Sequence, residues 1–546
     1  MGATKQSIHV VMLGAAVALA TAGGPAAGQA ADGGTAAKGS AAEGRALLWA
    51  YIDAGRKEAA ALRARLVESG ATAGQVADWL SAGRPAKPVE PRDTPWREIK
   101  VKAVDGRERA AVLRIPEAFK SWEKRHPLVV ELHGGVSYPK PRPTKEMKET
   151  DYSIVEKVAD RAFYLQPKGT RRAMWFDKVG SDNVRKAIAE VRRRYPIDPN
   201  RIYLSGFSDG AHGTYYFAAT HPEAFAGFVP LNGMPMMAQV AGEQVHMRNL
   251  LNKPLYIVNT GKDMLNPTPL VRRQVNLLKK AEAPLEFEFY ANLPHAPIYM
   301  KQEIDKITKW MSNTVREPYP SQLVWETADA KRSPGLHWLA VRKIGSVGND
   351  HAFADINFET GGRGVRLGVG VDRQWRGKGV KVTGVEEKSV AAGLGMKRGD
   401  VIVGFDGKAI AGFDPLRKAI DGKSPGDAMS VEVRREGEAD PLTFRGKFPD
   451  AKPNFAFKRE KPHGSIRAEY ADNRFDVQVK RVAEFELALS PAMVDFDKPI
   501  VVAVNGEVVH ERKVAPSLAA ALDRARRHAD PAQVYTAALR IEVPAR

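Results

Sequence analysis

The spacing of hydrophobic and polar positions changes twice along the chain. Between residues 40 and 82, apolar side chains recur at helical spacings, as at Leu62 and Leu66, in a background rich in Ala and Arg without a strand signal. Four prolines follow from Pro85 to Pro95 and are typical of a stiff linker. The pattern predicts an N-terminal helical segment over residues 40–82, and we expect its role to be packing or contact with a partner.

From Trp96 to about residue 316, short apolar runs alternate with helical patterns. The first two runs flank Asp105-Gly106, which predicts an opening antiparallel pair, and the later runs are short and mainly apolar, as in buried strands. Strands that alternate with helices predict a mainly parallel, doubly wound α/β sheet. The runs lie at residues 99–101, 110–113, 128–132, 162–165, 202–204, 227–229, 255–258 and 285–289.

Two of the intervening helices are indicated by their apolar spacing. The apolar residues from Val184 to Val191 follow the i, i+4, i+7 pattern, behind a candidate N-cap at Ser181 or Asp182. The same kind of pattern recurs over residues 304–311 and predicts a helix near the end of the α/β region.

After about residue 320, helical patterns become rare and strand patterns dominate. A Gly-rich module occupies residues 361–448, and apolar positions alternate with polar ones at Phe485, Leu487 and Leu489. Asn505-Gly506 stands between two β-branched runs and predicts a two-residue hairpin turn. Since 546 residues are too many for one hydrophobic core, we expect an α/β domain followed by a separate β-rich region.

The composition is that of a globular protein, and the charge and cysteine count narrow its class. The formal net charge of +19 favours contact with anionic surfaces such as envelope phospholipid, unless the basic residues only make the surface soluble. They are spread along the chain without zinc-finger spacing or interleaved aromatics, so we expect no nucleic acid partner. The absence of cysteine excludes disulfides, a Cys nucleophile, a thiolate metal site and a lipoprotein anchor.

The N-terminus has the layout of a secretory signal peptide over residues 1–30. Lys5 precedes an apolar run from Ile8 to Ala22, and small residues lead to a cleavage site at Gly28-Gln29-Ala30. The run is too short for a comfortable membrane span, although an uncleaved anchor is the alternative. We expect an exported protein, periplasmic or secreted, that is soluble after cleavage.

The main chemical motif is Gly206-Phe207-Ser208-Asp209-Gly210, which matches G-x-S-x-G. It follows the apolar run at 202–204 and precedes a helix-compatible stretch, which is the setting of a nucleophile elbow. A serine on this turn projects above the sheet at a helix N-terminus, where developing negative charge is stabilised. Because the motif alone also occurs by chance in surface turns, the setting is what identifies Ser208 as the candidate nucleophile.

A Gly-rich loop upstream of the serine supplies candidate oxyanion donors. His133-Gly134-Gly135 follows the apolar run at 128–132, so backbone N–H groups of this loop can face a reacting carbonyl. We expect an N–H near Gly135 and the N–H of Asp209 to form the oxyanion hole. The side chain of His133 is expected to be structural.

Two further candidates follow the serine in the chain order Ser, Asp, His. Asp263 comes after the apolar run at 255–258, and His295 comes after the run at 285–289. The imidazole of His295 would take the Ser208 proton, and Asp263 would fix the imidazole tautomer.

Other residues rival this acid and this base. Asp209 and Asp182 are alternative acids, and His212 and His221 are alternative bases. Asp209 and His212 are too close to Ser208 in sequence to reach round to its side chain. Asp182 precedes the serine, which is the wrong order for this kind of triad.

Residues 96–316 resemble secreted α/β-hydrolase esterases of the dienelactone hydrolase, polyhydroxybutyrate depolymerase-like and prolyl oligopeptidase group. The resemblance implies a carboxylic-ester hydrolase that forms an acyl-enzyme on Ser208 and needs no metal or organic cofactor. It departs from many relatives at Ala211-His212, where they carry a further Gly, and after His133-Gly134, where many have Cys. The motifs that carry it are Leu132–Gly135, Arg201–Gly210, Gly261–Asp263 and His295.

Residues 361–448 are similar to a PDZ domain of the kind attached to exported bacterial proteases. Arg366-Leu367-Gly368-Val369 matches the loop whose backbone N–H groups hold a C-terminal carboxylate while the peptide adds as a strand. Residues 413–420 would form the helix beside the groove. The resemblance implies that Leu367, Gly368 and Val369 bind a C-terminal peptide, unless the module is only a spacer or a packing domain.

The segments on either side of the module, 320–360 and 463–546, resemble two parts of one small β domain that trails some of these esterases. We infer that the PDZ-like module is inserted into that domain, because insertions succeed at exposed loop tips and this fold has close termini. Excision of the module, with the ends joined near Gly361 and His463, is expected to leave a folded hydrolase.

These patterns together predict an exported serine hydrolase that acts on esters. A serine peptidase of prolyl oligopeptidase type is the enzymatic alternative, less favoured because the sequence before residue 96 lacks the multi-blade β domain of that group. The non-enzymatic alternative is a peptide-binding envelope protein with a decayed hydrolase core, and the intact set of Ser208, Asp263 and His295 speaks against it.

Overall fold

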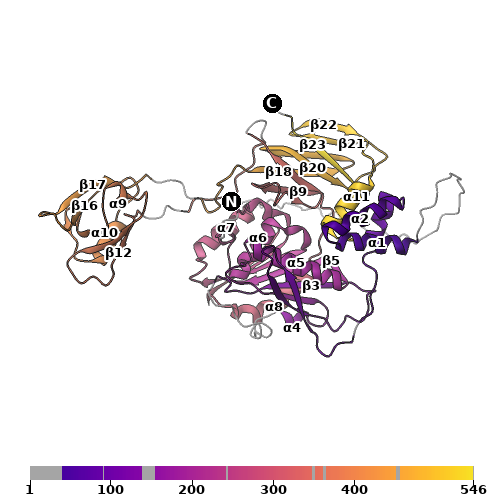
Figure 1. The fold of residues 1–546 in the computed structure, drawn as a ribbon, viewed down its shortest axis with the longest axis horizontal. Helices are drawn as coiled ribbons and strands as arrows, with labels where there is room; N and C mark the ends of the chain where they lie inside the picture. Colours follow the sequence, from indigo (N-terminus) through magenta and orange to yellow (C-terminus); the bar gives the residue numbers. More distant parts are fainter. Residues whose placement is uncertain are drawn as a thin grey trace, which may run out of the picture.

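The protein is described here by a computed structural model of residues 40–89, 91–137, 154–240, 244–346, 351–360, 365–450 and 455–544. The predicted signal peptide and the junction near Gly361 lie outside these ranges. Figure 1 shows an α/β domain with a β sandwich against it, N-terminal helices beside both, and a small β-rich module to the left. Within the described residues, no helix is both long enough and apolar enough to cross a membrane.

The α/β domain is built on an eight-stranded sheet with the strand order β1-β2-β4-β3-β5-β6-β7-β8. β1 and β2 form the predicted antiparallel pair, β2 is antiparallel to β4, and the remaining neighbours are parallel. This is the α/β-hydrolase arrangement, and it confirms the predicted fold class. The strands are β1 (Trp96–Lys102), β2 (Glu108–Arg114), β3 (His126–Leu132), β4 (Phe163–Pro167), β5 (Ile197–Phe207), β6 (Gly227–Leu231), β7 (Leu255–Lys262) and β8 (Leu285–Pro294).

Helices cover both faces of this sheet because its central strands are apolar on both sides. Leu128 and Val130 of β3 share a hydrophobic cluster with α5, α6 and α7, whereas Val129 between them belongs to the cluster of α4 and α8. The helices are α4 (Val155–Val158), α5 (Lys178–Arg194), α6 (Asp209–Thr220), α7 (Thr268–Lys280) and α8 (Met300–Asn313), with short 3₁₀ turns η2 (Pro222–Ala224), η3 (Pro235–Gln239), η4 (Met247–Asn252) and η5 (Pro297–Tyr299).

Helix α5 begins earlier than the sequence pattern predicted. Its N-cap is Asp177, whose Oδ1 accepts the Gly180 N–H at 2.7 Å. Ser181 and Asp182, the predicted caps, lie inside the helix. The prediction was wrong because all three residues are good caps, and Asp177 also accepts the Met174 N–H of the preceding turn at 2.8 Å.

The predicted N-terminal helical segment consists of α1 (Ala41–Asp53), α2 (Arg56–Glu68) and α3 (Ala73–Ser81). Its apolar side chains form one cluster with Leu522 and Ala525 of α11 (Leu518–His528), a helix that the sequence pattern did not reveal. Arg526 of α11 also donates to the backbone oxygen of Ala54 at 2.7 Å. The segment therefore packs against the C-terminal part of the chain.

The β sandwich draws its strands from both sides of the Gly-rich module. β9 pairs with β18, with Trp325 opposite Ile466, and β11 pairs with β20, with Val341 opposite Phe485. The turn at Asn505-Gly506 links β21 and β22 as predicted. One sheet contains β10 (Gly335–Leu336), β11 (Leu339–Ile344), β20 (Val482–Leu489) and β23 (Ala537–Glu542); the other contains β9 (Gln322–Thr327), β18 (Gly464–Ala471), β19 (Arg474–Lys480), β21 (Ile500–Val504) and β22 (Glu507–Arg512).

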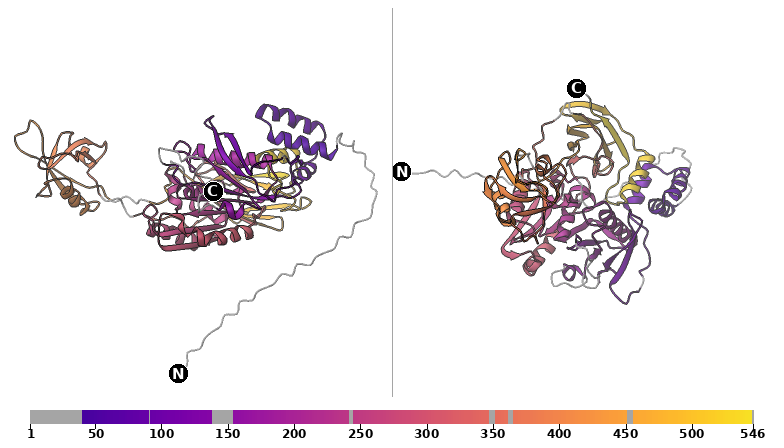
Figure 2. Two further views of the ribbon diagram at one scale, coloured as in Figure 1. Left: turned by 90° about the horizontal axis from the view of Figure 1, so that it is seen from below. Right: turned by 60° about the vertical axis from the view of Figure 1, so that its left-hand side comes forward.

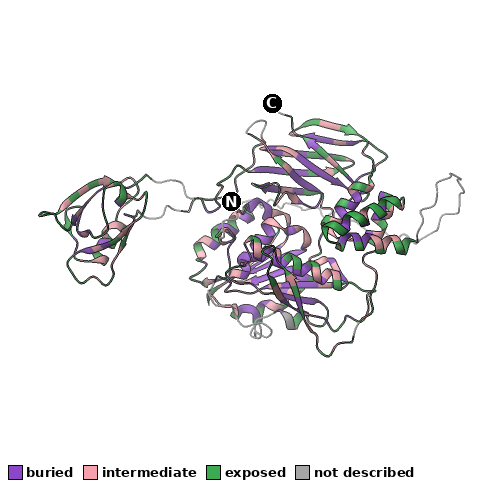
Figure 3. Cartoon of the chain, viewed as in Figure 1, coloured by how far each residue is buried: buried purple, intermediate pink, exposed green. Residues whose placement is uncertain are grey.

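The Gly-rich module folds around a hydrophobic cluster of its own. Its buried members, such as Leu367 and Val431, all lie between residues 365 and 448, and Figure 3 shows buried positions inside the module as well as in the main body. Its elements are β12 (Val369–Val371), β13 (Val380–Val385), α9 (Val390–Gly393), β14 (Val401–Phe405), β15 (Lys408–Ala409), α10 (Phe413–Asp421), β16 (Ala428–Arg434) and β17 (Leu442–Lys447).

Residues 351–360 and 455–463, which we call the strap, connect the module to the rest of the chain, and both connections are visible in Figure 2. The two segments pair with each other: Glu359 bridges to Phe455, and the Ala456 N–H donates to Phe358 O at 2.9 Å. Four strap side chains are buried in the main cluster of the α/β domain rather than in the sandwich to which the sequence assigned residues 320–360. They are Ile356, Phe358, Ala456 and Phe457.

Candidate active site

Ser208 lies on a sharp turn between β5 and α6. Its backbone has φ 59° and ψ −118°, a conformation that non-glycine residues adopt only when the surrounding structure enforces it. A Cβ on Gly206 would lie 2.4 Å from the Gly210 backbone, and a Cβ on Gly210 would lie 1.9 Å from Leu132 O. The two glycines therefore allow the close approach of strand and helix that a nucleophile elbow requires.

Three side chains from different loops meet at this elbow. His295, directly after β8, has its Nε2 2.8 Å from Ser208 Oγ and its Nδ1 2.7 Å from Asp263 Oδ2. Asp263 itself directly follows β7. The ring of Phe207 lies against the imidazole, with ring centroids 5.1 Å apart. The structure thus brings the three residues singled out from the sequence within hydrogen-bonding distance of one another.

Asp263 is fully buried and is surrounded by donors. Its Oδ1 accepts the backbone N–H groups of Leu265 and Asn266, both at 2.9 Å, and its Oδ2 accepts the side-chain N–H of Asn232 at 3.1 Å. Burial alone would raise the pKa of Asp263, but the hydrogen bonds from His295, Asn232 and Asn266 outweigh it and lower the pKa to about 2. The carboxylate is therefore ionised at neutral pH and favours a proton on Nδ1 of His295.

The Gly-rich loop passes close to the nucleophile. Gly135 has φ 71°, and a Cβ on Gly134 would lie 3.1 Å from Ser208 Cβ. The His133 ring holds the loop, because its Nε2 accepts a backbone N–H from the chain after β4 at 3.0 Å. Because α6 begins at Asp209, the first N–H groups of this helix have no acceptor within it and are available to an anion. The predicted oxyanion donors therefore come from the two segments that flank the Ser208 side chain.

The rival residues have other partners. On α5, Asp182 forms an ion pair with a lysine one turn further along, at 3.1 Å. His221 is partly buried, and desolvation of its ring lowers its pKa to about 3. Asp209 and His212 lie in the first turn of α6 and contact other side chains. Among the described residues, no hydrogen bond joins any of these four to the Ser208 hydroxyl, so the geometry favours Asp263 and His295.

The sequence analysis missed two buried asparagines that hold the acid. Asn232 follows β6 with φ 52°, and its Nδ2 donates to Thr260 Oγ1 at 2.6 Å as well as to Asp263. Asn266 donates to Asp263 from both its backbone and its side chain. Their positions just beyond the carboxyl ends of β6 and β7 were a usable signal, since α/β sheets gather functional groups at this edge.

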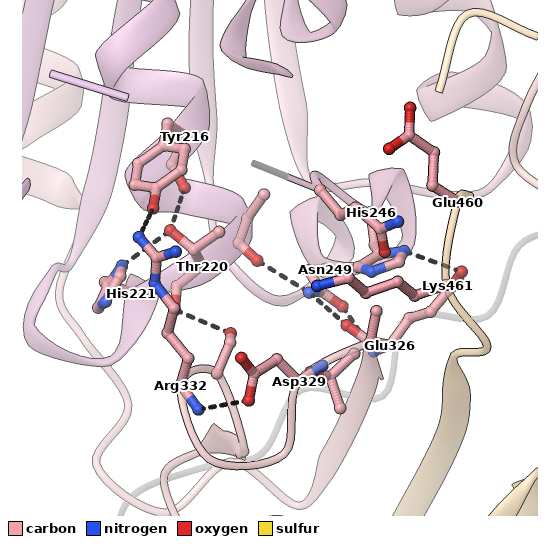
Figure 4. A pocket seen from close by; sticks show the side chains of 15 residues that line it. Tyr216, Thr220, His221, His246, Asn249, Glu326, Asp329, Arg332, Glu460 and Lys461 are labelled. Carbon is pink, nitrogen blue, oxygen red and sulfur yellow. Dashed lines mark hydrogen bonds and ion pairs between the residues drawn. The ribbon is translucent and has the colours of Figure 1, made fainter. Parts of the chain in front are cut away.

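A polar pocket of about 130 Å³ lies between α6, η4, β9 and the strap (Figure 4). One of its walls is Glu326, which is 2% exposed and lies 3.0 Å from His246 Nδ1 and 3.1 Å from Arg459 of the strap. Burial would raise the pKa of Glu326, but the hydrogen bond from His246 and the nearby cations lower it to about 2. Ion pairs of Glu326 therefore connect the α/β domain, the sandwich and the strap beside this pocket. Among the described residues, no group of three His, Asp or Glu side chains could hold a metal ion.

The loop that was predicted to bind a peptide carboxylate leads into the first strand of the module. Gly368 has φ 80°, and a Cβ there would lie 2.2 Å from Ser389 Cβ, so a side chain does not fit. Leu367 is buried, and Val369 begins β12 at the edge of the module's sheet. The sequence profile of PDZ domains matches residues 365–444. These residues form a PDZ domain. Its loop and its edge strand β12 have the geometry for strand addition by a peptide.

The chain has distant similarities to known hydrolases. A stretch of 53 residues is 38% identical to poly(3-hydroxyalkanoate) depolymerase C of Paucimonas lemoignei and spans 10% of this chain and 13% of the depolymerase. Among solved structures, a thermostable esterase is 19% identical, with a TM-score of 0.34 over 41% of this chain and 64% of the esterase. The acylaminoacyl peptidase of Pyrococcus horikoshii is 16% identical, with a TM-score of 0.34 over 41% of this chain and 42% of the peptidase. The strand order described above, and not these similarities, identifies the fold.

Proposed function

We propose that this protein is an exported serine hydrolase that cleaves carboxylic esters through an acyl-enzyme on Ser208. One observation carries the proposal: His295 Nε2 lies 2.8 Å from Ser208 Oγ, while its Nδ1 lies 2.7 Å from Asp263. A nucleophile, a base and an orienting acid in this arrangement perform acyl transfer on several unrelated folds.

In this mechanism His295 Nε2 accepts the Ser208 hydroxyl proton as Oγ attacks the ester carbonyl carbon. The negative charge that develops on the carbonyl oxygen is stabilised by the N–H groups of Asp209 and Gly135. His295 then gives the proton to the departing alcohol. In the second half-reaction, deacylation, His295 activates the water that hydrolyses the acyl-enzyme. Asp263, with a pKa of about 2, stays ionised and stabilises the imidazolium in both halves.

An ester is favoured over a peptide by the stretch shared with a poly(3-hydroxyalkanoate) depolymerase, because hydroxy acids in a polymer are joined by ester bonds. That stretch spans 13% of the depolymerase. The proposal requires no cofactor, since Ser208, His295 and Asp263 supply the nucleophile and accept and return the proton.

Fluorophosphonate labelling, followed by p-nitrophenyl esters of graded chain length, tests the proposal. Wild-type protein should be labelled and turn over, and Ser208→Ala should lose both properties while its melting temperature is unchanged. Wild-type-like turnover by folded Ser208→Ala would contradict it. A peptide anilide cleaved faster than any ester would instead assign a peptidase, and failure of the wild type to react at all would favour a peptide-binding envelope protein.

We also propose that the PDZ domain binds a polypeptide C-terminus at Leu367, Gly368 and Val369, and that residues 1–30 direct export. The φ of 80° at Gly368 and the edge position of β12 support the first proposal. The charged and apolar regions at the N-terminus support the second. In the envelope, the net charge of +19 favours contact with anionic surfaces.

A further inference from the structure

The first turn of α6 carries two side chains that contact the loops on either side of the nucleophile. Asp209 and His212 are three residues apart, and their side chains are 14% and 8% exposed. Asp209 Oδ2 accepts the backbone N–H of Ser137 at 3.0 Å and its hydroxyl at 2.8 Å. Asp209 therefore ties the end of the loop at residues 133–137, which carries a predicted oxyanion donor, to the elbow.

His212 makes the corresponding link to the acid. Its Nδ1 lies 3.7 Å from Asp209 Oδ1, and its Nε2 lies 3.2 Å from Asn266 Oδ1. Asn266 Nδ2 donates to the backbone oxygen of Asn232 at 3.0 Å and to Asp263 Oδ2 at 3.3 Å. Because this amide nitrogen is already engaged, its oxygen faces His212, and Nε2 is the donor in that bond. Contacts thus run without a break from the oxyanion loop to Asp263.

The charge of Asp209 strengthens its hold on the loop. Burial would raise its pKa, but the nearby His212 and the hydrogen bonds from Ser137 lower the pKa to about 2. The carboxylate therefore accepts both Ser137 bonds as an anion, and charge-assisted hydrogen bonds are about twice as strong as neutral ones. Such a hold matters because oxyanion donors stabilise the transition state only when they are fixed in place before the reaction.

We propose that Asp209 and His212 are positioning residues for the reaction at Ser208. Asp209 fixes the oxyanion loop through Ser137, and His212 fixes the acid loop through Asn266. The inference rests on the proposed hydrolase function. It also gives a role to the buried imidazole of His212.

Truncation of Asp209 tests its proposed role in fixing the oxyanion loop. Asp209→Ala should lower kcat on a p-nitrophenyl ester about 100-fold, as does the loss of one oxyanion donor, with KM within about 3-fold. Ser137→Ala removes one of the two loop bonds and should lower kcat about 10-fold. The matched control is Asp182→Ala, which removes a helical carboxylate of similar exposure, 15%, that is also paired with a cation three residues on. It should keep the wild-type kcat.

A double variant tests the proposed role of His212 with a readout that a general packing defect would not give. His212→Ala alone should lower kcat about 10-fold, but added to Asp263→Asn it should cost less than about 3-fold more, because both changes act on the same acid. A fully multiplicative loss would overturn the role of His212. A kcat of Asp209→Ala within 3-fold of wild type, or an equal loss in Asp182→Ala, would overturn the role of Asp209.

Ser208→Ala, measured beside these variants, separates this inference from the proposed function. If Ser208→Ala keeps its turnover, the proposed function fails. If Ser208→Ala is inactive while Asp209→Ala is normal, only the positioning role fails. Should Asp209→Ala not fold, Ser137→Ala decides the role of Asp209, and unchanged kcat and KM in that variant would refute it.

Discussion

Removal of the PDZ domain at the strap should leave the hydrolase intact, whereas removal of eight residues more should unfold it. The narrow excision deletes residues 361–454 and joins Thr360 to Phe455 through a Gly-Ser pair. The two ends are neighbours, since Glu359 bridges to Phe455. The wide excision joins the chain near Gly361 and His463, as the sequence boundaries suggested, and so deletes 455–462 as well. The structure therefore changes the expectation for the wide variant from folded to unfolded.

The difference between the two variants follows from what residues 455–462 bury. Phe457 is 2% exposed in the α/β core, and loss of a buried Phe side chain costs about 3–5 kcal/mol. Gln239 of η3 bonds to Ala456 O at 2.8 Å and to Lys458 N at 3.1 Å, and each bond contributes about 1 kcal/mol. The sum of about 5–7 kcal/mol approaches the whole stability of a typical domain, about 5–15 kcal/mol.

Thermal melting and ester turnover of three variants decide the matter. The narrow excision should melt within a few degrees of wild type and keep its turnover. The wide excision should aggregate, and so should a chain that ends at residue 360, because β9 loses β18, β11 loses β20 and their edges are exposed. A wide excision that melts like the narrow one would refute the reasoning from Phe457. A well-behaved truncated chain would refute the need for pairing across the module.

Asp263→Asn should lower kcat on the order of 10⁴-fold by favouring the wrong imidazole tautomer, and ester kinetics that show Asp182→Asn inactive instead would place the acid there. The pKa of Glu326 is lowered from 4.5 to about 2, so its contribution of about 3 kcal/mol is complete above about pH 5 and is lost as the pH falls towards 2. In Glu326→Gln, the free energy of unfolding measured by urea titration should therefore fall less between about pH 5 and pH 2 than in the wild type. An unchanged fall would refute this prediction. Gly368→Ala should abolish binding of peptides with a free C-terminal carboxylate, measured by fluorescence anisotropy against amidated controls; unchanged affinity would exclude the loop. N-terminal sequencing of the native protein should begin near Ala31, and Met1 in a membrane fraction would support an uncleaved anchor.

The candidate site could be predicted because its signals are local. Ser208, Asp263 and His295 each follow a short apolar run, and neighbouring parallel strands bring their carboxyl ends to one edge of a sheet. The asparagines that support Asp263 were missed because an Asn after a strand reads equally well as a turn residue. Only the folded arrangement shows that their amide groups face the acid.

The strap could not be predicted for a different reason. Ile356 and Phe457 are about 100 residues apart in the sequence. The residues next to an apolar side chain in the sequence do not indicate which hydrophobic core it will join. The strand pattern around Ile356 placed it in the β domain, and the segment that contains Phe457 was assigned to no domain. Helix α11 was missed as well, because it is a single helix between the strands β22 and β23, in a region where strand patterns dominate. Tertiary packing, and not local propensity, decides such cases.

The short connection between the strap and the PDZ domain limits how far that domain can move from the α/β domain. Five peptide units separate residue 360 from residue 365, and an extended chain spans at most about 3.6 Å per residue, so the start of the PDZ core stays within about 18 Å of the strap. Any polypeptide held by its C-terminus in that domain is therefore confined near the hydrolase at an effective concentration in the millimolar range.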